Sequence, residues 1–325
     1  MNKLESAPLV SIVLTTYNGQ TFLGQQLDSL FQQTYPEIEI IAVDDGSRDH
    51  TVSILQEYAA RHPNMKVFVN ETNLGFIKNF EKGCRLSSGN WIALCDQDDY
   101  WSPEKIEKMV GQIGDHPMIY HDSRLCGEDL QDLGRNISDI VNFSSFDNCL
   151  QLSVFCRMYG HALLITRSLF NKAYPFLTII PHDWWLSYMA TLHGGIKFLP
   201  EPLVLYRQHV ANVYGVVGGK RKREEGETRK GNAKSKREER REKKRKEVDA
   251  IRSRIRIFYE ACPEDYEKEK RVLAALDRSY RDFSLVNDIR RVVIFLRHYK
   301  LLLTVKKYSL FRKYLFCLKM FVKIK

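Results

Sequence analysis

The sequence predicts an α/β protein built on a mostly parallel central sheet that is flanked by helices. Apolar runs of strand length occur at 9–15, 38–43, 65–69 and 91–95, and segments with apolar residues at helical spacing separate them. This alternation is typical of parallel strands joined by right-handed crossovers. Two of the runs also lead directly into clustered acids, which places carboxylates at the carboxyl ends of strands, where open α/β sheets bind ligands.

The first half of the chain supplies these strands and their connections in order. The run LVSIVLT is rich in β-branched residues and leads into the polar loop TTYNG. Helical spacing over 21–33 is ended by the pair Tyr35–Pro36, and further helices are expected over 49–61 and 76–85. These segments complete the predicted βαβαβ order and lead to the fourth strand at Trp91.

The second half is less regular. We expect a helix over 103–113, a brief strand at 118–120 and a strand at 162–166, and we assign no fold to 121–153, which is polar and rich in turn residues. The segment IIPHDWWLSYMATLHGG predicts a helix whose first turn carries Asp183. Closing strands are expected at 196–199 and 203–206.

Composition and charge bound the classes of function. An apolar content of 44% in 325 residues is enough for a real core, and the seven scattered cysteines contain no CxxC pair. Reduced thiols and a start without a basic segment and cleavage site favour a cytoplasmic protein that is not exported. Net charge is −8 over 1–219, +8 over 220–247 and +11 over 289–325, so the front and the end of the chain should have different partners.

The stretch WIALCDQDDYW contains the densest acidic cluster. Asp96, Asp98 and Asp99 follow the apolar run at once, and such acids repel one another unless a cation compensates them. Carboxylates together with substrate phosphates are what Mg²⁺ prefers, and Mn²⁺ suits the same ligands. The alternative is an acidic loop before the helix at Pro103, with Ser102 as its N-cap. A second acidic pair, Asp44 and Asp45, ends the run at 38–43.

The ordered blocks SIVLTTYNG, QTYP, VDDGSRD, NLGF, LSSGNWIALCDQDD and HDWW resemble the inverting family 2 glycosyltransferases with the GT-A fold. The resemblance runs from about Leu9 to Asn212. DQDDYW, HDWW and YRQHVANVYG are most similar to a bacterial rhamnosyltransferase-like subset. The resemblance implies a GT-A domain, which we place over 1–219. The residues 220–247 are almost without apolar side chains and predict a charged linker or solvated helix, and helical patterning then predicts a basic extension over 248–325.

The resemblance also implies roles for single residues. Thr15, Tyr17, Asp44 and Asp45 match the positions that hold the nucleotide base and ribose, with Asp45 as the expected base contact. Asp96, Asp98 and Asp99 match the acidic signature that binds the metal and the donor diphosphate, with Asp98 as direct ligand and Asp96 or Asp99 assisting. Asp183 matches the catalytic base, and His209 is expected to contact the phosphate or the metal.

Each assignment has a structural alternative. Asp44 can form an Asx turn before Gly46, Asp183 can cap its helix, Tyr17 can pack at the sheet edge and His209 can be a surface histidine. Trp184 and Trp185 suit a core or the wall of an acceptor pocket. Relatives commonly carry a small pair such as Gly-Cys before the strand at 162, whereas this chain has Gly160 and His161, and this departure weakens any transfer of acceptor specificity.

The expected partners follow from these residues and from the basic end. We expect a nucleotide-sugar donor, dTDP-rhamnose or a UDP-hexose, and a glycan or lipid-linked acceptor. The +11 segment, in which apolar and basic residues alternate, suits the anionic inner face of a membrane as a peripheral contact, and its longest charge-free runs, about five residues, are too short to span a bilayer. Nucleic-acid binding and a merely solvated extension are the competing interpretations.

Overall fold

The computed structural model describes residues 7–209, 233–282 and 284–321, and its chain forms two compact units. The N-terminal unit comprises 1–149 and 156–209, and the C-terminal unit comprises 150–155 and 210–325. The expected linker at 220–247 lies outside the described residues up to 232, and its remainder belongs to helix α8. The sequence did not anticipate that 150–155 would join the C-terminal unit.

A nine-stranded sheet, counted over the described residues, forms the N-terminal unit in the order β3-β2-β1-β4-β8-β6-β9-β5, and β7 pairs with β6. Its strands are β1 (Val10–Thr16), β2 (Ile38–Asp44), β3 (Met65–Val69), β4 (Trp91–Cys95), β5 (Tyr100–Trp101), β6 (Met118–Cys126), β7 (Asp132–Asn136), β8 (Leu163–Thr166) and β9 (Ile196–Arg207). Strands β1 to β4 are parallel, as expected, and β6 is parallel to β9. Strands β5, β7 and β8 run antiparallel to their neighbours, so the second half of the sheet is mixed.

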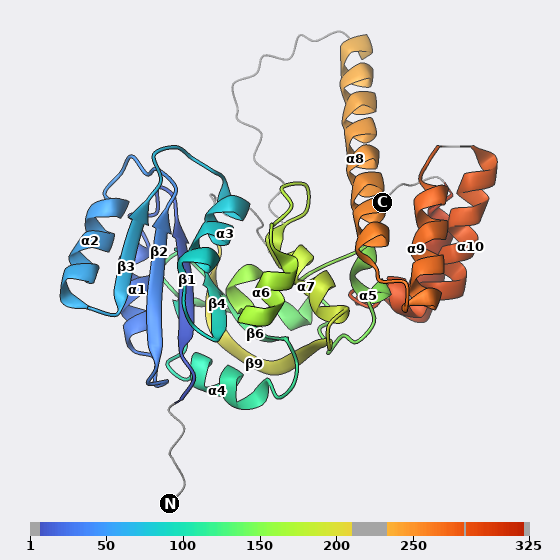
Figure 1. The fold of residues 1–325 in the computed structure, drawn as a ribbon. Helices are drawn as coiled ribbons and strands as arrows, with labels where there is room; N and C mark the ends of the chain where they lie inside the picture. Colours follow the sequence, from blue (N-terminus) through green and yellow to red (C-terminus); the bar gives the residue numbers. More distant parts are fainter. Residues whose placement is uncertain (1–6, 210–232, 283, 322–325) are drawn as a thin grey trace, which may run out of the picture. The chain divides into compact units, whose positions relative to one another are not determined.

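Helices cover both faces of the parallel half (Figure 1). Side chains of α1 (Leu23–Phe31), α2 (Thr51–Arg61) and α4 (Lys105–Gln112) join Ile12, Leu14 and Ile40 in one core cluster. Val13 points to the other face because side chains alternate along a strand. There α3 (Phe76–Leu86) approaches so closely that a Cβ on Gly83 would lie 2.3 Å from Val13 Cγ1. The helices thereby fix the carboxyl ends of β1, β2 and β4 at one edge.

Strand β6 is longer than its sequence suggested. It continues to Cys126 through His121, Asp122 and Ser123, which are all buried although they are polar. This continuation pairs with β9 along its length and with β7 at Arg124 and Cys126, whereas β8 pairs only with Met118 to Tyr120. Pairing between strands thus holds the segment in the sheet although its residues are polar. Short elements connect the rest of the unit: the 3₁₀ turns Ile137–Asp139 and Gly160–Ala162, α6 (Arg167–Ala173) and α7 (His182–Thr191).

The C-terminal unit is helical. It contains α5 (Leu150–Ser153), α8 (Ala233–Ala261), α9 (Glu267–Ser279), α10 (Leu285–Leu302) and α11 (Leu310–Lys319). Its core includes Phe258 of α8, Leu276 of α9 and Phe295 of α10, which are fully buried. Across the described residues no helix has both the length and the apolar content needed to cross a membrane.

Candidate active site

The loops that follow β1, β2 and β4 form the candidate site. These three strands are neighbours and run in the same direction, and Thr16 of β1 pairs with Asp44 of β2. Their carboxyl ends therefore meet at the edge where α/β sheets bind ligands. All the residues predicted from the sequence as nucleotide or metal contacts, apart from His209, lie in or next to these loops.

Asp44 is fully buried and bonded within the protein. Its carboxylate accepts four hydrogen bonds: from Gly46 N (3.0 Å), Ser47 N (2.8 Å), Ser47 Oγ (2.5 Å) and Thr16 Oγ1 (2.8 Å). Gly46 has a φ of 80°, a left-handed conformation that favours glycine. This geometry favours the Asx-turn interpretation of Asp44, in which the residue shapes the loop and does not touch the donor.

Asp45 organises the next loop. Its carboxylate accepts hydrogen bonds from Asn70 Nδ2 (2.8 Å), Leu74 N (2.7 Å) and Gly75 N (2.9 Å), and so holds the chain that enters α3. Thr15 is also buried, whereas Tyr17 is 45% exposed. Of the four predicted nucleotide contacts, Tyr17 therefore has the largest exposed surface, and the other three are buried.

Gln97 joins the first loop to the acidic loop. Its side chain accepts from the backbone N–H of Tyr17 at 2.8 Å and donates to the backbone oxygen of Tyr17 at 3.1 Å. A Cβ on Gly19 would lie 2.1 Å from Gln97 Oε1, so a larger residue at this position would displace the end of the Gln97 side chain from its bonds to Tyr17. The sequence prediction missed this residue, although its place between Asp96 and Asp98 is the signal that identifies it.

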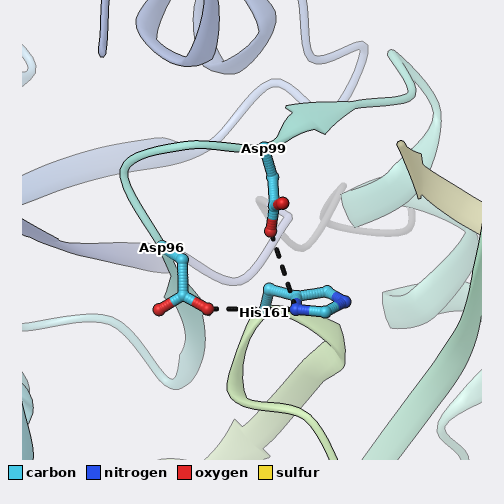
Figure 2. A group of neighbouring side chains, drawn as sticks. All are labelled: Asp96, Asp99 and His161. Carbon is cyan, nitrogen blue, oxygen red and sulfur yellow. Dashed lines mark ion pairs between the residues drawn. The ribbon is translucent and has the colours of Figure 1, made fainter. Parts of the chain in front are cut away.

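Asp96, Asp99 and His161 form a compact group (Figure 2). Their potential ligand atoms lie within 4.8 Å of one another. His161 Nδ1 faces Asp99 Oδ2 at 3.6 Å and Asp96 Oδ2 at 3.9 Å. The other ring nitrogen, Nε2, lies 2.9 Å from Ser123 Oγ on β6, which fixes the orientation of the ring. His161 was noted in the sequence only as a departure from the family pattern.

The charges in this group are strongly perturbed. Burial, with the negative charges of Asp98 and Asp183, raises the pKa of Asp96 to about 7. Burial, with the negative charges of Asp98 and Asp96, raises the pKa of Asp99 well above its ordinary value. Asp99 Oδ1 accepts from Arg207 N at 3.1 Å, but Oδ2 is buried and finds no hydrogen-bond partner among the described residues.

Lys105 is a buried cation beside the acidic group. Its ammonium donates to the backbone oxygen of His161 at 2.6 Å and lies 3.1 Å from the centre of the Trp101 ring. Burial lowers the pKa of Lys105 to about 7, and burial together with this cation lowers the pKa of His161 to about 3. His161 is therefore neutral, which is the form that binds a metal ion.

Asp98 and His209 form a separate pair. His209 Nε2 lies 2.7 Å from Asp98 Oδ2 at the end of β9. The metal ligands predicted from the sequence, Asp98, Asp99 and His209, are thus divided between two groups. Asp98 lies with His209, and Asp99 lies with Asp96 and His161.

Arg207 connects the two groups. Its side chain is buried and donates to Asp98 O at 2.7 Å, to Gln25 Oε1 at 2.8 Å and to Glu128 O. Its guanidinium lies 4.4 Å from the centre of the Phe22 ring. The sequence prediction did not single out Arg207, which acts here as the internal brace of the acidic loop.

Asp183 stands in the first turn of α7, where its Oδ1 accepts from Trp184 N at 2.7 Å. Burial raises the pKa of Asp183 to about 7. The charge of Asp183 contributes to the raised pKa of Asp96, so the two carboxylates are electrostatic neighbours. A carboxylate with a pKa near neutral pH is suited to proton transfer.

His182 fixes the start of α7. Its ring is buried against Phe80 at 4.4 Å and Phe76 at 5.8 Å between ring centres, and neither ring nitrogen has a hydrogen-bond partner among the described residues. Burial lowers the pKa of His182 to about 3. Trp185 is also buried and donates from Nε1 to Ala173 O at 2.7 Å, which supports its interpretation as a core residue.

Comparison with known proteins identifies the class through the fold. The crystal structure of S. aureus TarS 1–349 in complex with UDP-GlcNAc has a TM-score of 0.57 and 17% sequence identity, and the match covers 97% of this chain and 80% of that chain. The protein thus has the GT-A fold predicted from the sequence, with an additional helical C-terminal unit.

The family follows from sequence. Residues 11–172 match the model of glycosyl transferase family 2. A glycosyltransferase of Haemophilus influenzae is 30% identical over 222 residues, or 63% of this chain and 67% of that protein. A protein of Mycobacterium tuberculosis is 30% identical over 216 residues, which span 63% of this chain and 60% of that protein. The chain belongs to glycosyl transferase family 2.

Proposed function

We propose that this protein transfers a sugar from a nucleotide-sugar donor to a hydroxyl of a glycan or lipid-linked acceptor, by a metal-dependent single displacement that inverts the anomeric configuration. The observation that carries the proposal is the pairing of an acidic cluster at the strand ends with a separate half-buried carboxylate, Asp183, at a helix start. The cluster suits a cation and a diphosphate, and the separate acid suits proton removal.

The residues fit a divalent metal ion, Mg²⁺ or Mn²⁺. Asp99 Oδ2 is a buried carboxylate oxygen without a hydrogen bond among the described residues, His161 presents its neutral Nδ1 to it, and Asp96 adds a third ligand atom. Asp98, with His209, offers a further carboxylate beside them. When bound, the ion supplies Lewis-acid stabilisation of the charge that develops on the departing nucleoside diphosphate.

The chain's own residues perform the remaining steps. Tyr17 and the loops that Asp44 and Asp45 organise form the binding site for the nucleoside. Asp183 takes the proton of the acceptor hydroxyl while that oxygen forms a bond to the anomeric carbon. The bond from this carbon to the diphosphate oxygen breaks in the same step, and the diphosphate leaves with the bonding electron pair. The product sugar therefore has the opposite anomeric configuration to the donor.

The donor is proposed to be dTDP-rhamnose or a UDP-hexose. The motifs resemble a rhamnosyltransferase-like subset, whereas TarS has been crystallised with UDP-GlcNAc, so both classes belong in one screen. We would measure the thermal shift with Mn²⁺ and each donor, and then determine by NMR the anomeric configuration of the product made with the donor that binds. A retained configuration would contradict single displacement.

Two competing functions give different results in the same experiments. A nucleotide-sugar-binding partner without transferase activity would show the thermal shift and no product. A nucleic-acid-binding protein would show neither, and the net charge of −8 over 1–219 disfavours nucleic-acid binding by the unit that contains the site.

We propose that the protein acts at the cytoplasmic face of the membrane as a peripheral protein.

A further inference from the structure

Large exposed apolar side chains are concentrated in the last two helices of the C-terminal unit. Of the twenty exposed large apolar residues in the described parts of the chain, eleven lie between Leu285 and Phe321. A surface of this kind marks an interaction site more often than scattered single residues do. The candidate active site in the N-terminal unit does not account for this exposed apolar surface.

Helix α11 carries the clearest such surface. Successive helical residues are rotated by about 100°, so the following five residues fall within an arc of about 140°. They are Leu310, Phe311, Tyr314, Leu315 and Leu318, which are between 39% and 71% exposed. We call this set the α11 arc. The opposite side faces inward, since Met320 is buried there and Phe316 packs on Phe295, and the buried Cys317 lies beside the arc.

Basic residues border the α11 arc. Arg312 and Lys319 follow its edge around the helix, and both are exposed. Helix α10 repeats the arrangement, because its exposed Leu285, Val286, Ile289 and Val293 share one side of the helix and Arg290 and Arg297 are exposed beside them. From residue 289 to the end the sequence has eleven basic residues and no acid.

We propose that the α11 arc inserts into the headgroup region of an anionic lipid bilayer, with Arg312 and Lys319 bound to lipid phosphates. An exposed apolar face bordered by cations, on a helix too short to span a membrane, fits such an interfacial contact. A second copy of the chain fits less well, since a symmetric contact would bring two strongly basic segments together. This proposal specifies the contact behind the peripheral membrane location proposed above, and it does not depend on the sugar-transfer chemistry.

The test uses the full-length protein and sedimentation with lipid vesicles. Vesicles of phosphatidylcholine with about one third phosphatidylglycerol should bind the wild type. The partition coefficient for pure phosphatidylcholine vesicles should be lower by a factor of at least about ten. The triple variant Phe311→Ser, Leu315→Ser, Leu318→Ser should partition at least about tenfold less. Arg312→Gln with Lys319→Gln should lose most of the preference for anionic vesicles.

A matched control removes exposed apolar residues elsewhere. Leu133→Ser with Ile140→Ser changes two exposed side chains of the N-terminal unit and should leave partitioning unchanged. Undiminished partitioning of the triple variant would overturn the proposal. So would a triple variant that merely converts an oligomer to a monomer in light scattering. Sugar transfer to a water-soluble acceptor should survive in the triple variant, so its absence in the wild type counts against the proposed function alone.

Discussion

His161 Nδ1 faces Asp99 Oδ2 at 3.6 Å in the interior of the site, and this carboxylate oxygen has no hydrogen-bond partner among the described residues. An unpartnered anionic oxygen in a buried place is costly unless a proton or a cation compensates it. The high pKa of Asp99 reflects that cost. A neutral imidazole held by Ser123 beside it completes a group of side chains that could hold a metal ion.

The first prediction concerns this histidine. His161→Ala should weaken Mn²⁺ binding by about 10- to 100-fold, the usual effect of losing a ligand or its support. The measurement is the electron paramagnetic resonance signal of free Mn²⁺ in a titration without donor, which does not depend on activity. The matched control is His116→Ala. His116 lies in the loop after α4, and its ring bonds only to Ile113 O in the described structure.

The outcome also separates the two groups of acids. If His209→Ala abolishes Mn²⁺ binding and His161→Ala leaves it unchanged, the ion is held by Asp98 and His209, and His161 serves only to pack beside Tyr206, whose ring centre lies 4.4 Å away. Asp98→Ala should weaken binding in either case.

The second prediction concerns the base. Asp183→Asn should reduce turnover by about 100-fold or more, since proton removal by a side chain typically contributes 10² to 10⁴. Donor and metal binding should remain, because the variant keeps the side-chain oxygen that accepts from Trp184 N. Isothermal titration with donor and Mn²⁺ gives the binding, and product formation gives the turnover. Turnover equal to that of the wild type would remove Asp183 from its role.

The pH dependence of the wild type provides an independent test. Asp183 acts as a base only when it is ionised, and its pKa is raised to about 7. The value of kcat/KM should therefore increase about tenfold per pH unit up to about pH 7 and level off above it. Because a carboxylate with a raised pKa destabilises the folded state once it ionises, Asp183→Asn should also melt at a higher temperature than the wild type at pH 8.

The third prediction distinguishes a structural from a direct role for Asp44. Asp44→Ala leaves the buried donor of Thr16 and the half-buried donors of Gly46 and Ser47 without their acceptor and should cost about 3 kcal/mol of unfolding free energy. Asp44→Asn keeps one acceptor oxygen and should cost less. Urea denaturation gives both values. If Asp44→Asn instead abolishes donor binding at wild-type stability, Asp44 contacts the donor directly.

Sequence patterns predicted the parallel half of the fold because its strands are buried on both faces and are therefore continuous apolar runs. Ile38–Asp44 and Trp91–Cys95 are examples, and the acids that follow them were recognised for the same reason. Strand β6 was only partly predicted, because His121, Asp122 and Ser123 are buried polar residues that no apolar period marks.

The composition of the acidic groups could not be read from the sequence. Asp98 and Asp99 are adjacent in the chain, but their carboxylates face His209 and His161, which come from the ends of different elements. Arg207 lies more than one hundred residues from the loop that it braces, so no local spacing connects them. Tertiary packing alone decides these partners.

The fourth prediction concerns His182, whose buried ring has no hydrogen bond on either nitrogen among the described residues. On burial the imidazole of His182 loses its hydration and gains no hydrogen bond in return. His182→Leu replaces this polar ring with an apolar side chain of similar size, so the variant should be as stable as the wild type or more stable at pH 7.5. The experiment measures urea denaturation at several pH values.

The difference should increase in acid. The pKa of His182 is lowered to about 3 in the folded state, whereas the unfolded chain takes up a proton near pH 6.5, so stability from this group is complete above that pH and is lost as the pH falls. At pH 5 the variant should gain about 2 kcal/mol relative to the wild type, at about 1.4 kcal/mol per pH unit. The control Ile165→Val changes a buried apolar residue and should lower the free energy of unfolding by the same amount at both pH values. If His182→Leu and the wild type had the same pH dependence of stability, the ring would already be protonated or solvated in the folded protein.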